Sequence, residues 1–134
     1  MLVVKTFLKY SPIHGLGCFA GEDIKKGQLV WRFDPGIDLT FTEEEVKKLP
    51  GPFQEFLKTY GYSPSLPLKT YILCVDHARH MNHSESPSLL ETSEGHNVAA
   101  RDISQGEELT CNYHDFDAEA QLKLLKNQID LHGS

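Results

Sequence analysis

Cysteine is scarce in this sequence, and its apolar runs are short. The three cysteines are Cys18, Cys74 and Cys111, and no two of them form a Cys-x-x-Cys pair. An odd count without that spacing argues against a disulfide framework and against a cysteine-rich zinc module. Apolar runs reach only the length of Ile72–Val75, whereas a membrane-spanning helix needs about 20 apolar residues. We therefore expect no membrane partner and an intracellular, cytoplasmic setting.

Positive charge is also in short supply. Lys and Arg number 13 against 19 Asp and Glu, a formal net charge of −6. Phosphate contacts need Lys and Arg, so we expect no direct binding of nucleic acid. The charge suits a cationic protein partner, although solubility alone explains it equally well. Met1–Tyr10 has two lysines and no small-residue cleavage site, so it lacks the pattern of a signal peptide.

The length and composition indicate one globular domain. The chain has 134 residues, 40% of them hydrophobic and 24% charged. Two domains of half this length would each be too small to bury a good core. We therefore expect a single domain over residues 1–134. The sequence does not specify the oligomeric state.

Short strands separated by glycine corners dominate the pattern. Apolar runs with little helical period predict strands over Leu2–Lys5, Phe7–Tyr10, Cys18–Ala20, Gln28–Phe33, Tyr71–Val75, Asn97–Ala100 and Glu108–Asn112. The pattern Asp-Ile-x-x-Gly occurs twice, at residues 23–27 and 102–106. By itself the repeat indicates two similar corners between strands.

Two helical regions interrupt this pattern. Thr42 and Glu45 form a capping-box sequence, and Pro50 and Pro52 separate a first short helix from a second. The second has an apolar stripe at Phe53, Phe56, Leu57 and Tyr60, and Gly61 suits its C-terminal end. Together they form a helical insert over about residues 42–61, and a loop over Ser63–Pro67 follows.

A last helix is expected over about residues 117–131. Asp117 can cap its N-terminus. Leu122, Leu125 and Ile129 share one face of it.

Three segments in a fixed order carry a family resemblance. They are Gly15–Ala20 with Ile24–Gly27, Ala78–Ser84 with Pro87, and Ala100–Ile103 with Gly106–Thr110 and Tyr113. Each is weak alone, but their combination resembles the SET-domain family of protein lysine methyltransferases, in its compact stand-alone form. The resemblance covers a core of about residues 1–116.

The resemblance implies the fold and the reaction. It implies a mainly β protein with a small helical insert and a C-terminal helix, in a SET-like β-clip fold. In this fold the segment ending in the tyrosine passes through a loop near Asn-His, forming a pseudoknot. The activity it implies is methyl transfer from S-adenosylmethionine to a lysine amine, which depends mainly on positioning and desolvation of that amine.

The cofactor site follows residue by residue from the matched motifs. The resemblance implies that the backbone around Gly15, Leu16 and Gly17 holds part of S-adenosylmethionine. It assigns the side chain of Asn82 to the amino-acid end of the cofactor and the backbone of His83 to the adenine. Arg79 matches the arginine of the same motif and either supports this loop or pairs with an acid. No metal is implied.

Tyr113 matches the active-site tyrosine of the family. The resemblance implies that its phenol oxygen orients the lysine amine and stabilises the polarised methyl group. Cys111 lies where many members carry Phe or Tyr, a position that influences how many methyl groups are added. Because Cys is smaller, a roomier site that permits more than one methyl group is an open alternative.

The walls of the lysine channel are less clearly defined. The cysteine-rich zinc segment that follows the tyrosine in many relatives is missing, so Phe116 and the last helix are expected to close the channel. Trp31 and Phe33 are candidates for aromatic walls, with core packing as the alternative. Ser88 after Pro87 is a departure from the motif, which often has Asn there. The resemblance implies that Asp34, Asp38 and Glu43–Glu45 lie on the substrate side, where acidic residues suit a lysine-rich substrate. A role at the start of the first helix is the alternative for this acidic group, and both can hold.

Two other functions stay open at this point. A catalytically weak or inactive SET-like module could bind the cofactor or a basic peptide, given the departures at Ser88 and Cys111. His77, His80 and His83 recur at a spacing of three and offer imidazole ligands for a zinc hydrolase. On a helix these three side chains would spread over about 120° and converge only marginally.

Overall fold

The computed structural model describes residues 1–64 and 70–131, with side chains as far as residue 128. The strands are β1 Thr6–Tyr10, β2 Leu16–Ala20, β3 Leu29–Trp31, β4 Leu39–Thr42, β5 Thr70–Leu73, β6 Asn82–His83, β7 Leu89–Glu91, β8 Asn97–Ala99 and β9 Glu108–Cys111. The helices are α1 Glu43–Lys47, α2 Gly51–Tyr60 and α3 Ala120–Leu131, with 3₁₀ turns η1 His77–His80 and η2 Tyr113–Asp115. The mainly β architecture with few helices is as predicted.

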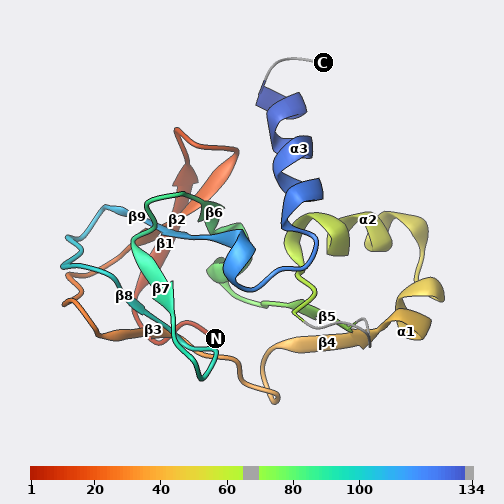
Figure 1. The fold of residues 1–134 in the computed structure, drawn as a ribbon, viewed down its shortest axis with the longest axis horizontal. Helices are drawn as coiled ribbons and strands as arrows, with labels where there is room; N and C mark the ends of the chain where they lie inside the picture. The colour runs from red at the N-terminus through yellow and green to blue at the C-terminus, as the bar shows by residue number, and fades with distance from the viewer. Residues whose placement is uncertain (65–69, 132–134) are drawn as a thin grey trace.

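The strands form three small sheets (Figure 1). Their orders are β1-β2-β9-β6, β3-β8-β7 and β4-β5. In the largest sheet β9 is antiparallel to β2 and parallel to the very short β6. This pairing places the segment before Tyr113 between the glycine turn and Asn82–His83, the place where the resemblance implies a pseudoknot.

The core lies between the first two sheets. It contains Cys18, Ile24, Val30, Leu89, Ile103 and Leu109, each with at most 2% of its surface exposed. The predicted strand Leu2–Lys5 is not a strand, and only Leu2 makes an isolated bridge, with Trp31. Strands β4, β6 and β7 were not predicted, because each has four residues or fewer.

The two Asp-Ile-x-x-Gly corners pack against each other. Ile24 and Ile103 exchange both backbone hydrogen bonds, each at 2.8 Å. The Asp23 carboxylate accepts from the Gln105 amide and the Asp102 carboxylate from the Lys26 amide, both at 2.8 Å. The repeat therefore forms a nearly symmetric junction between the two halves of the core.

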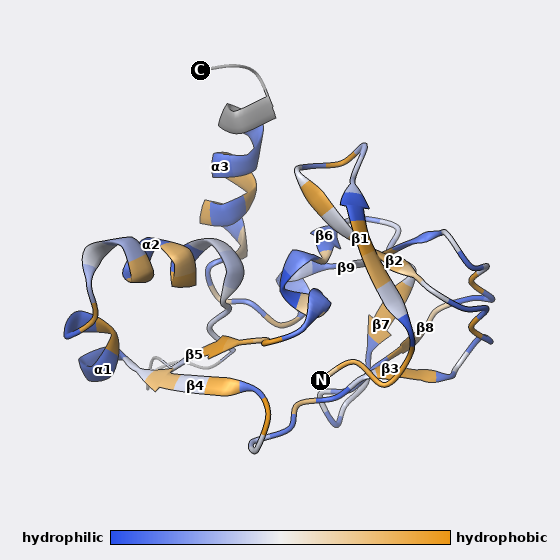
Figure 2. Cartoon of the chain, turned by 180° about the vertical axis from the view of Figure 1, so that it is seen from behind, coloured by the Kyte–Doolittle hydropathy of each residue, from blue (hydrophilic) through white to orange (hydrophobic). Residues whose placement is uncertain are grey.

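The helical insert is carried on the β4–β5 hairpin. The capping box at Thr42 and Glu45 is confirmed, with both of its hydrogen bonds at 3.1 Å. Gly61 ends α2 as predicted but has an extended backbone, and a Cβ there would lie 2.7 Å from the Leu57 carbonyl oxygen. The need for glycine therefore comes from close approach of two backbone segments. Figure 2 shows β4 and β5 as largely apolar and α1 as mostly polar.

Helix α3 projects from the body of the molecule (Figure 1). Asp117 precedes it as predicted, accepting hydrogen bonds from the amides of Glu119 at 3.0 Å and Ser63 at 3.2 Å. The apolar face is not packed, because Leu122 is 67% and Leu125 47% exposed. The side chain of Ile129 and the predicted loop beyond Pro64 lie outside the described residues. No helix in the described part of the chain is long and apolar enough to cross a membrane.

Candidate active site

Tyr113 lies directly after β9, at the start of the turn η2. Its phenol donates to the backbone carbonyl of Met81 at 2.7 Å, and its amide donates to Nδ1 of His83 at 3.1 Å. Burial raises the pKa of the phenol, and the thiol of Cys111 nearby adds to the shift. Tyr113 is therefore a fixed, neutral hydroxyl at physiological pH.

Two cavities meet at this tyrosine. The narrower, about 70 Å³, is lined by Trp31, Cys111 and Phe116, which were predicted for the lysine channel. The broader, about 640 Å³, is lined by Gly15, Leu16 and Asn82, which were predicted for the cofactor. Residues shared by the two linings are Thr59, Tyr60, Arg79, Met81, Tyr113 and Lys123. The chain therefore offers one small compartment and one of ordinary ligand size, with Tyr113 in the lining of both.

The glycine turn forms one wall of the broader cavity. Gly15 has a φ of +47°, a conformation that favours glycine, and a Cβ there would meet nothing within 4 Å. Its carbonyl accepts from the Ser11 amide at 2.8 Å, which closes the turn. Gly17 has a different role, because a Cβ there would lie only 2.5 Å from Oε2 of Glu108. Its missing side chain makes room for that carboxylate.

Glu108 is a site residue that the sequence did not single out. Its carboxylate accepts from the Ser11 hydroxyl at 2.8 Å and from the Asn82 amide at 2.9 Å. Asn82 also donates to the His14 carbonyl at 3.0 Å. One acidic side chain thus fixes the glycine turn to the Asn-His strand. Its position in the Gly-Glu-Glu-Leu-Thr motif was the available signal, but the pattern alone did not indicate what it binds.

Arg79 lies on η1 at the edge of both cavities. Its guanidinium carbon is 5.5 Å from the ring centroid of Phe56 on α2. The neighbouring His80 packs against Tyr60, with ring centroids 5.1 Å apart. Arg79 therefore contacts the aromatic stripe of α2 and supplies a positive charge to the lining of both cavities.

Ser88, the departure from the motif, has a structural role. It is 1% exposed, and its hydroxyl accepts from the Thr110 amide at 2.9 Å and donates to the Glu108 carbonyl at 3.2 Å. Its own amide donates to the Thr110 hydroxyl at 2.9 Å. Ser88 thus braces β9 just before Tyr113, which explains a small hydroxyl residue at this position.

The aromatic walls are only partly as predicted. Trp31 is 6% exposed and lines the narrow cavity, and Phe116 lies between Tyr62 and Tyr113 at centroid distances of 5.2 and 6.0 Å. Phe33 is 37% exposed and is not among the described residues that line either cavity. Strand β3 ends at Trp31, two residues before Phe33, and the assignment of Phe33 to the channel stays a prediction.

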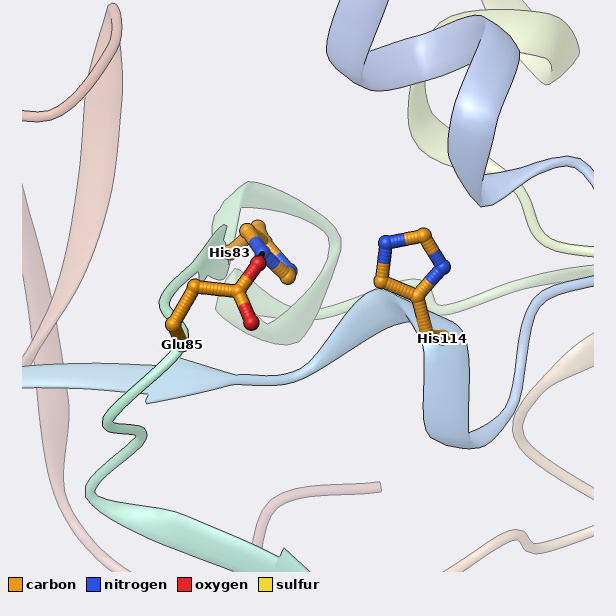
Figure 3. A group of neighbouring side chains, drawn as sticks. All are labelled: His83, Glu85 and His114. Atoms are coloured by element: carbon orange, nitrogen blue, oxygen red, sulfur yellow. Dashed lines mark hydrogen bonds and ion pairs between the residues drawn. The ribbon is translucent and has the colours of Figure 1, made fainter.

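The histidine trio does not form a ligand set. His77 contacts the Thr6 hydroxyl at 2.9 Å, His80 packs on Tyr60, and His83 contacts Glu85 at 3.0 Å. In the described part of the chain, His83, Glu85 and His114 do gather, with ligand atoms within 4.8 Å of one another (Figure 3).

The hydrogen bonds of His83 disfavour a metal in this group. Nδ1 of His83 accepts from Tyr113, so the ring proton of the neutral form is on Nε2, facing Glu85. A metal bound at Nε2 would move that proton to Nδ1. Nδ1 could then no longer accept the hydrogen bond from the Tyr113 amide. This neighbourhood instead fixes His83, which is absent from the described lining of both cavities, against β9.

The broader cavity fits the chemistry of the amino-acid end of S-adenosylmethionine, which carries an ammonium and a carboxylate. Gly15 leaves open space before the backbone, and Arg79 supplies a positive charge for a carboxylate. Carbonyl oxygens of the glycine turn are acceptors for an ammonium. The buried amide of Asn82 holds that turn in place. These residues would hold the two charged groups of the cofactor.

The fold and these paired cavities define a compact, mainly β domain in which two cavities share one tyrosine in their linings. A model of the SET domain family matches residues 15–114. A search of curated proteins found no match.

Solved structures with this fold come from larger assemblies and from a small parasite protein. The chain is 21% identical to a Chaetomium thermophilum Polycomb Repressive Complex 2 chain bound to S-adenosylmethionine, with a TM-score of 0.64. The match covers 92% of this chain and 17% of that one, so this chain spans about a sixth of its length. A candidate histone methyltransferase of Plasmodium falciparum is 20% identical, over 82% of this chain and 93% of that one, with a TM-score of 0.56.

The chain belongs to the SET domain family. Members of this family are protein lysine methyltransferases that use S-adenosylmethionine. The fold class predicted from the resemblance is confirmed. The roles assigned to the individual site residues stay predictions, and the geometry above shows which of them lie together.

Proposed function

We propose that this protein transfers methyl groups from S-adenosylmethionine to the side-chain amine of a lysine in a basic protein. One observation carries the proposal: Tyr113 separates a cavity of cofactor size from a narrow, aromatic-lined cavity. S-adenosylmethionine supplies an electrophilic methyl group when bound. The residues of the chain then have to bring a neutral amine to it.

Tyr113 orients that amine. Because burial raises the pKa of its phenol, the group stays protonated and does not act as a base near neutral pH. Its proton is donated to the Met81 carbonyl, so the lone pairs of the oxygen are free to accept from the amine. The lysine loses its own proton to water before it reacts, and the site contributes positioning and exclusion of water.

The substrate surface is acidic but smaller than the sequence suggested. Asp38 is 3% exposed and accepts from the N-terminal ammonium of Met1 at 2.9 Å, so it does not face a substrate. Glu43 and Glu44 are exposed on α1, and they support a preference for lysine-rich protein segments.

Titration calorimetry and a methyl-transfer assay test the proposal together. We expect S-adenosylmethionine to bind wild type and Tyr113→Phe alike, and turnover of mixed basic proteins to fall roughly 100-fold in the variant. Tyr10→Phe is the matched control, because Tyr10 is 85% exposed, and it is expected to behave as wild type.

The other outcomes separate the alternatives. A folded wild-type protein that does not bind S-adenosylmethionine would overturn the proposal. Binding without turnover on any basic protein would favour a SET-like module that only binds cofactor or peptide. Equal turnover in wild type and Tyr113→Phe would remove Tyr113 from the mechanism.

A further inference from the structure

Lys123 reaches from α3 into the junction of the two cavities. It lines both of them, and its side chain is only 14% exposed. Its ammonium donates to the carboxylate of Asp117 and to the carbonyl of Gly61, and it lies 5.9 Å from the ring centroid of Tyr113. A cationic amine of the chain itself therefore lies beside the proposed catalytic tyrosine.

The groups that hold this ammonium are fixed by other contacts. The second oxygen of Asp117 accepts from the amides of Ser63 and Glu119. Gly61 is held by the hydrogen bond that its amide donates to the Leu57 carbonyl at 2.8 Å. Tyr113 is held by its hydrogen bonds to Met81 and His83. A carboxylate, a carbonyl and an aromatic face together are the partners that a primary ammonium binds best. They would remain in place if Lys123 left.

Because the Asp117 carboxylate is buried, it strongly favours a bound cation. The Asp117 side chain is 1% exposed, and a nearly buried carboxylate without its cationic partner is costly. In contrast, the helix that carries Lys123 leaves Leu122 and Leu125 exposed, and it projects from the body (Figure 1). The groups that bind the ammonium are therefore more firmly fixed than the Lys123 side chain that they hold.

We propose that Asp117, the Gly61 carbonyl and the face of Tyr113 form a binding site for a primary alkylammonium, which Lys123 occupies in this structure. The ammonium of a substrate lysine exchanges with Lys123 there and is held before it loses its proton. This inference rests on the proposed function, because it identifies the ammonium as that of the substrate. It makes Lys123 an internal competitor of the substrate.

The test uses n-butylammonium, which has the stem and charge of a lysine side chain, and no cofactor. We expect Lys123→Met to bind n-butylammonium at least tenfold more tightly than wild type in calorimetry. Lys126→Met is the matched control, since Lys126 lies on the same helix and contacts the Thr59 hydroxyl at 3.1 Å. Its affinity is expected to equal that of wild type. Adding Asp117→Asn to Lys123→Met is expected to abolish the gain.

Three results would overturn the inference. They are an unchanged affinity in folded Lys123→Met, an equal gain in Lys126→Met, and a gain that survives Asp117→Asn. If Lys123→Met does not melt cooperatively, Lys123→Gln replaces it, because its amide still donates, and the same gain is required. If the protein transfers methyl groups but Lys123→Met binds n-butylammonium no more tightly than wild type, only this inference is overturned. If Lys123→Met does bind n-butylammonium more tightly but the protein does not bind S-adenosylmethionine, the alkylammonium site stands and the proposed function is overturned.

Discussion

At the scale of single residues, Glu108 connects the parts of the site that come from distant positions in the chain. It joins Ser11, Gly17 and Asn82 through one carboxylate. The sequence motif contained this residue, but its partners lie 26 to 97 positions away in the chain. Such a role is visible only after folding.

Gly17→Ala tests this arrangement. The new Cβ would lie 2.5 Å from Oε2 of Glu108, so the carboxylate must move away from Asn82 and the glycine turn loosens. We expect the affinity for S-adenosylmethionine to fall about tenfold, roughly 1.4 kcal/mol, in calorimetry. Gly51→Ala, where a Cβ meets nothing within 4 Å, is the control and should not change the affinity. Unchanged binding in Gly17→Ala would contradict the role given to Glu108.

Cys111→Phe tests the size of the narrow cavity. Cys111 is 6% exposed and lines this cavity of about 70 Å³. A phenyl ring there would fill space that a methylated amine needs, so we expect mass spectrometry to show products with fewer methyl groups per lysine. Cys111→Ala, which adds no volume, should leave the product distribution as in wild type. The same distribution in a folded Cys111→Phe variant would exclude this cavity as the limit on methylation.

At the scale of elements, the paired Asp-Ile-x-x-Gly corners couple the two halves of the core. Each aspartate accepts from an amide in the other corner, across 76 and 82 positions of the chain. The corners thus stabilise each other through side-chain bonds as well as through the exchanged bonds of Ile24 and Ile103.

Asp23→Ala and Asp102→Ala measure that coupling. Each removes one acceptor, and we expect each to lower the free energy of unfolding by about 1 kcal/mol in urea titrations. Because both variants loosen the same junction, the double variant is expected to lose less than the sum of the two. Glu44→Ala on α1, where the Glu44 side chain is 81% exposed, provides a comparison outside the junction. Exact additivity would mean that the two corners act independently.

At the scale of the whole molecule, the packing of α2 against η1 makes stability depend on pH. Burial is the main cause that lowers the pKa of His80 below its usual value, and the charge of Arg79 adds to it. A histidine with a lowered folded-state pKa binds protons more readily when unfolded. Its contribution to stability is therefore lost as pH falls below the ordinary histidine range, near 6.5.

Urea unfolding at pH 7.5 and 5.5 checks this dependence. We expect wild type to lose more stability between the two values than His80→Gln, which cannot become charged. Burial raises the pKa of Glu91, and the charge of Asp115 adds to this shift, so protonation of Glu91 favours the folded state as pH falls. Because this effect opposes that of His80 and is present in both proteins, the difference between wild type and His80→Gln is the informative quantity. Equal losses in both proteins would show that His80 does not control this dependence.

Prediction from sequence succeeded where the signal was local. The capping box at Thr42, the aromatic stripe of α2 and the helix after Asp117 depend on neighbours within a few positions, and each was found. Strands β4 and β6 were missed because they are short and stabilised by partners far along the chain. Strand β7 was missed because it has only three residues, although its partner β8 follows it directly in the sequence. The predicted strand Gln28–Phe33 ran two residues too far, because an alternating apolar pattern does not indicate where a strand ends.

The sequence by itself determined the family, the small β elements and the identity of the motif residues, since these follow from residue types at fixed spacings. Only the tertiary structure decided what those residues do together. In the folded protein the Glu108 carboxylate occupies the space left by the missing side chain of Gly17, and Asp38 accepts a hydrogen bond from the N-terminal ammonium. Folding also places Lys123 beside Tyr113. The physical reason is that burial and hydrogen-bond partners arise from contacts between distant segments, and composition and spacing carry no record of those contacts.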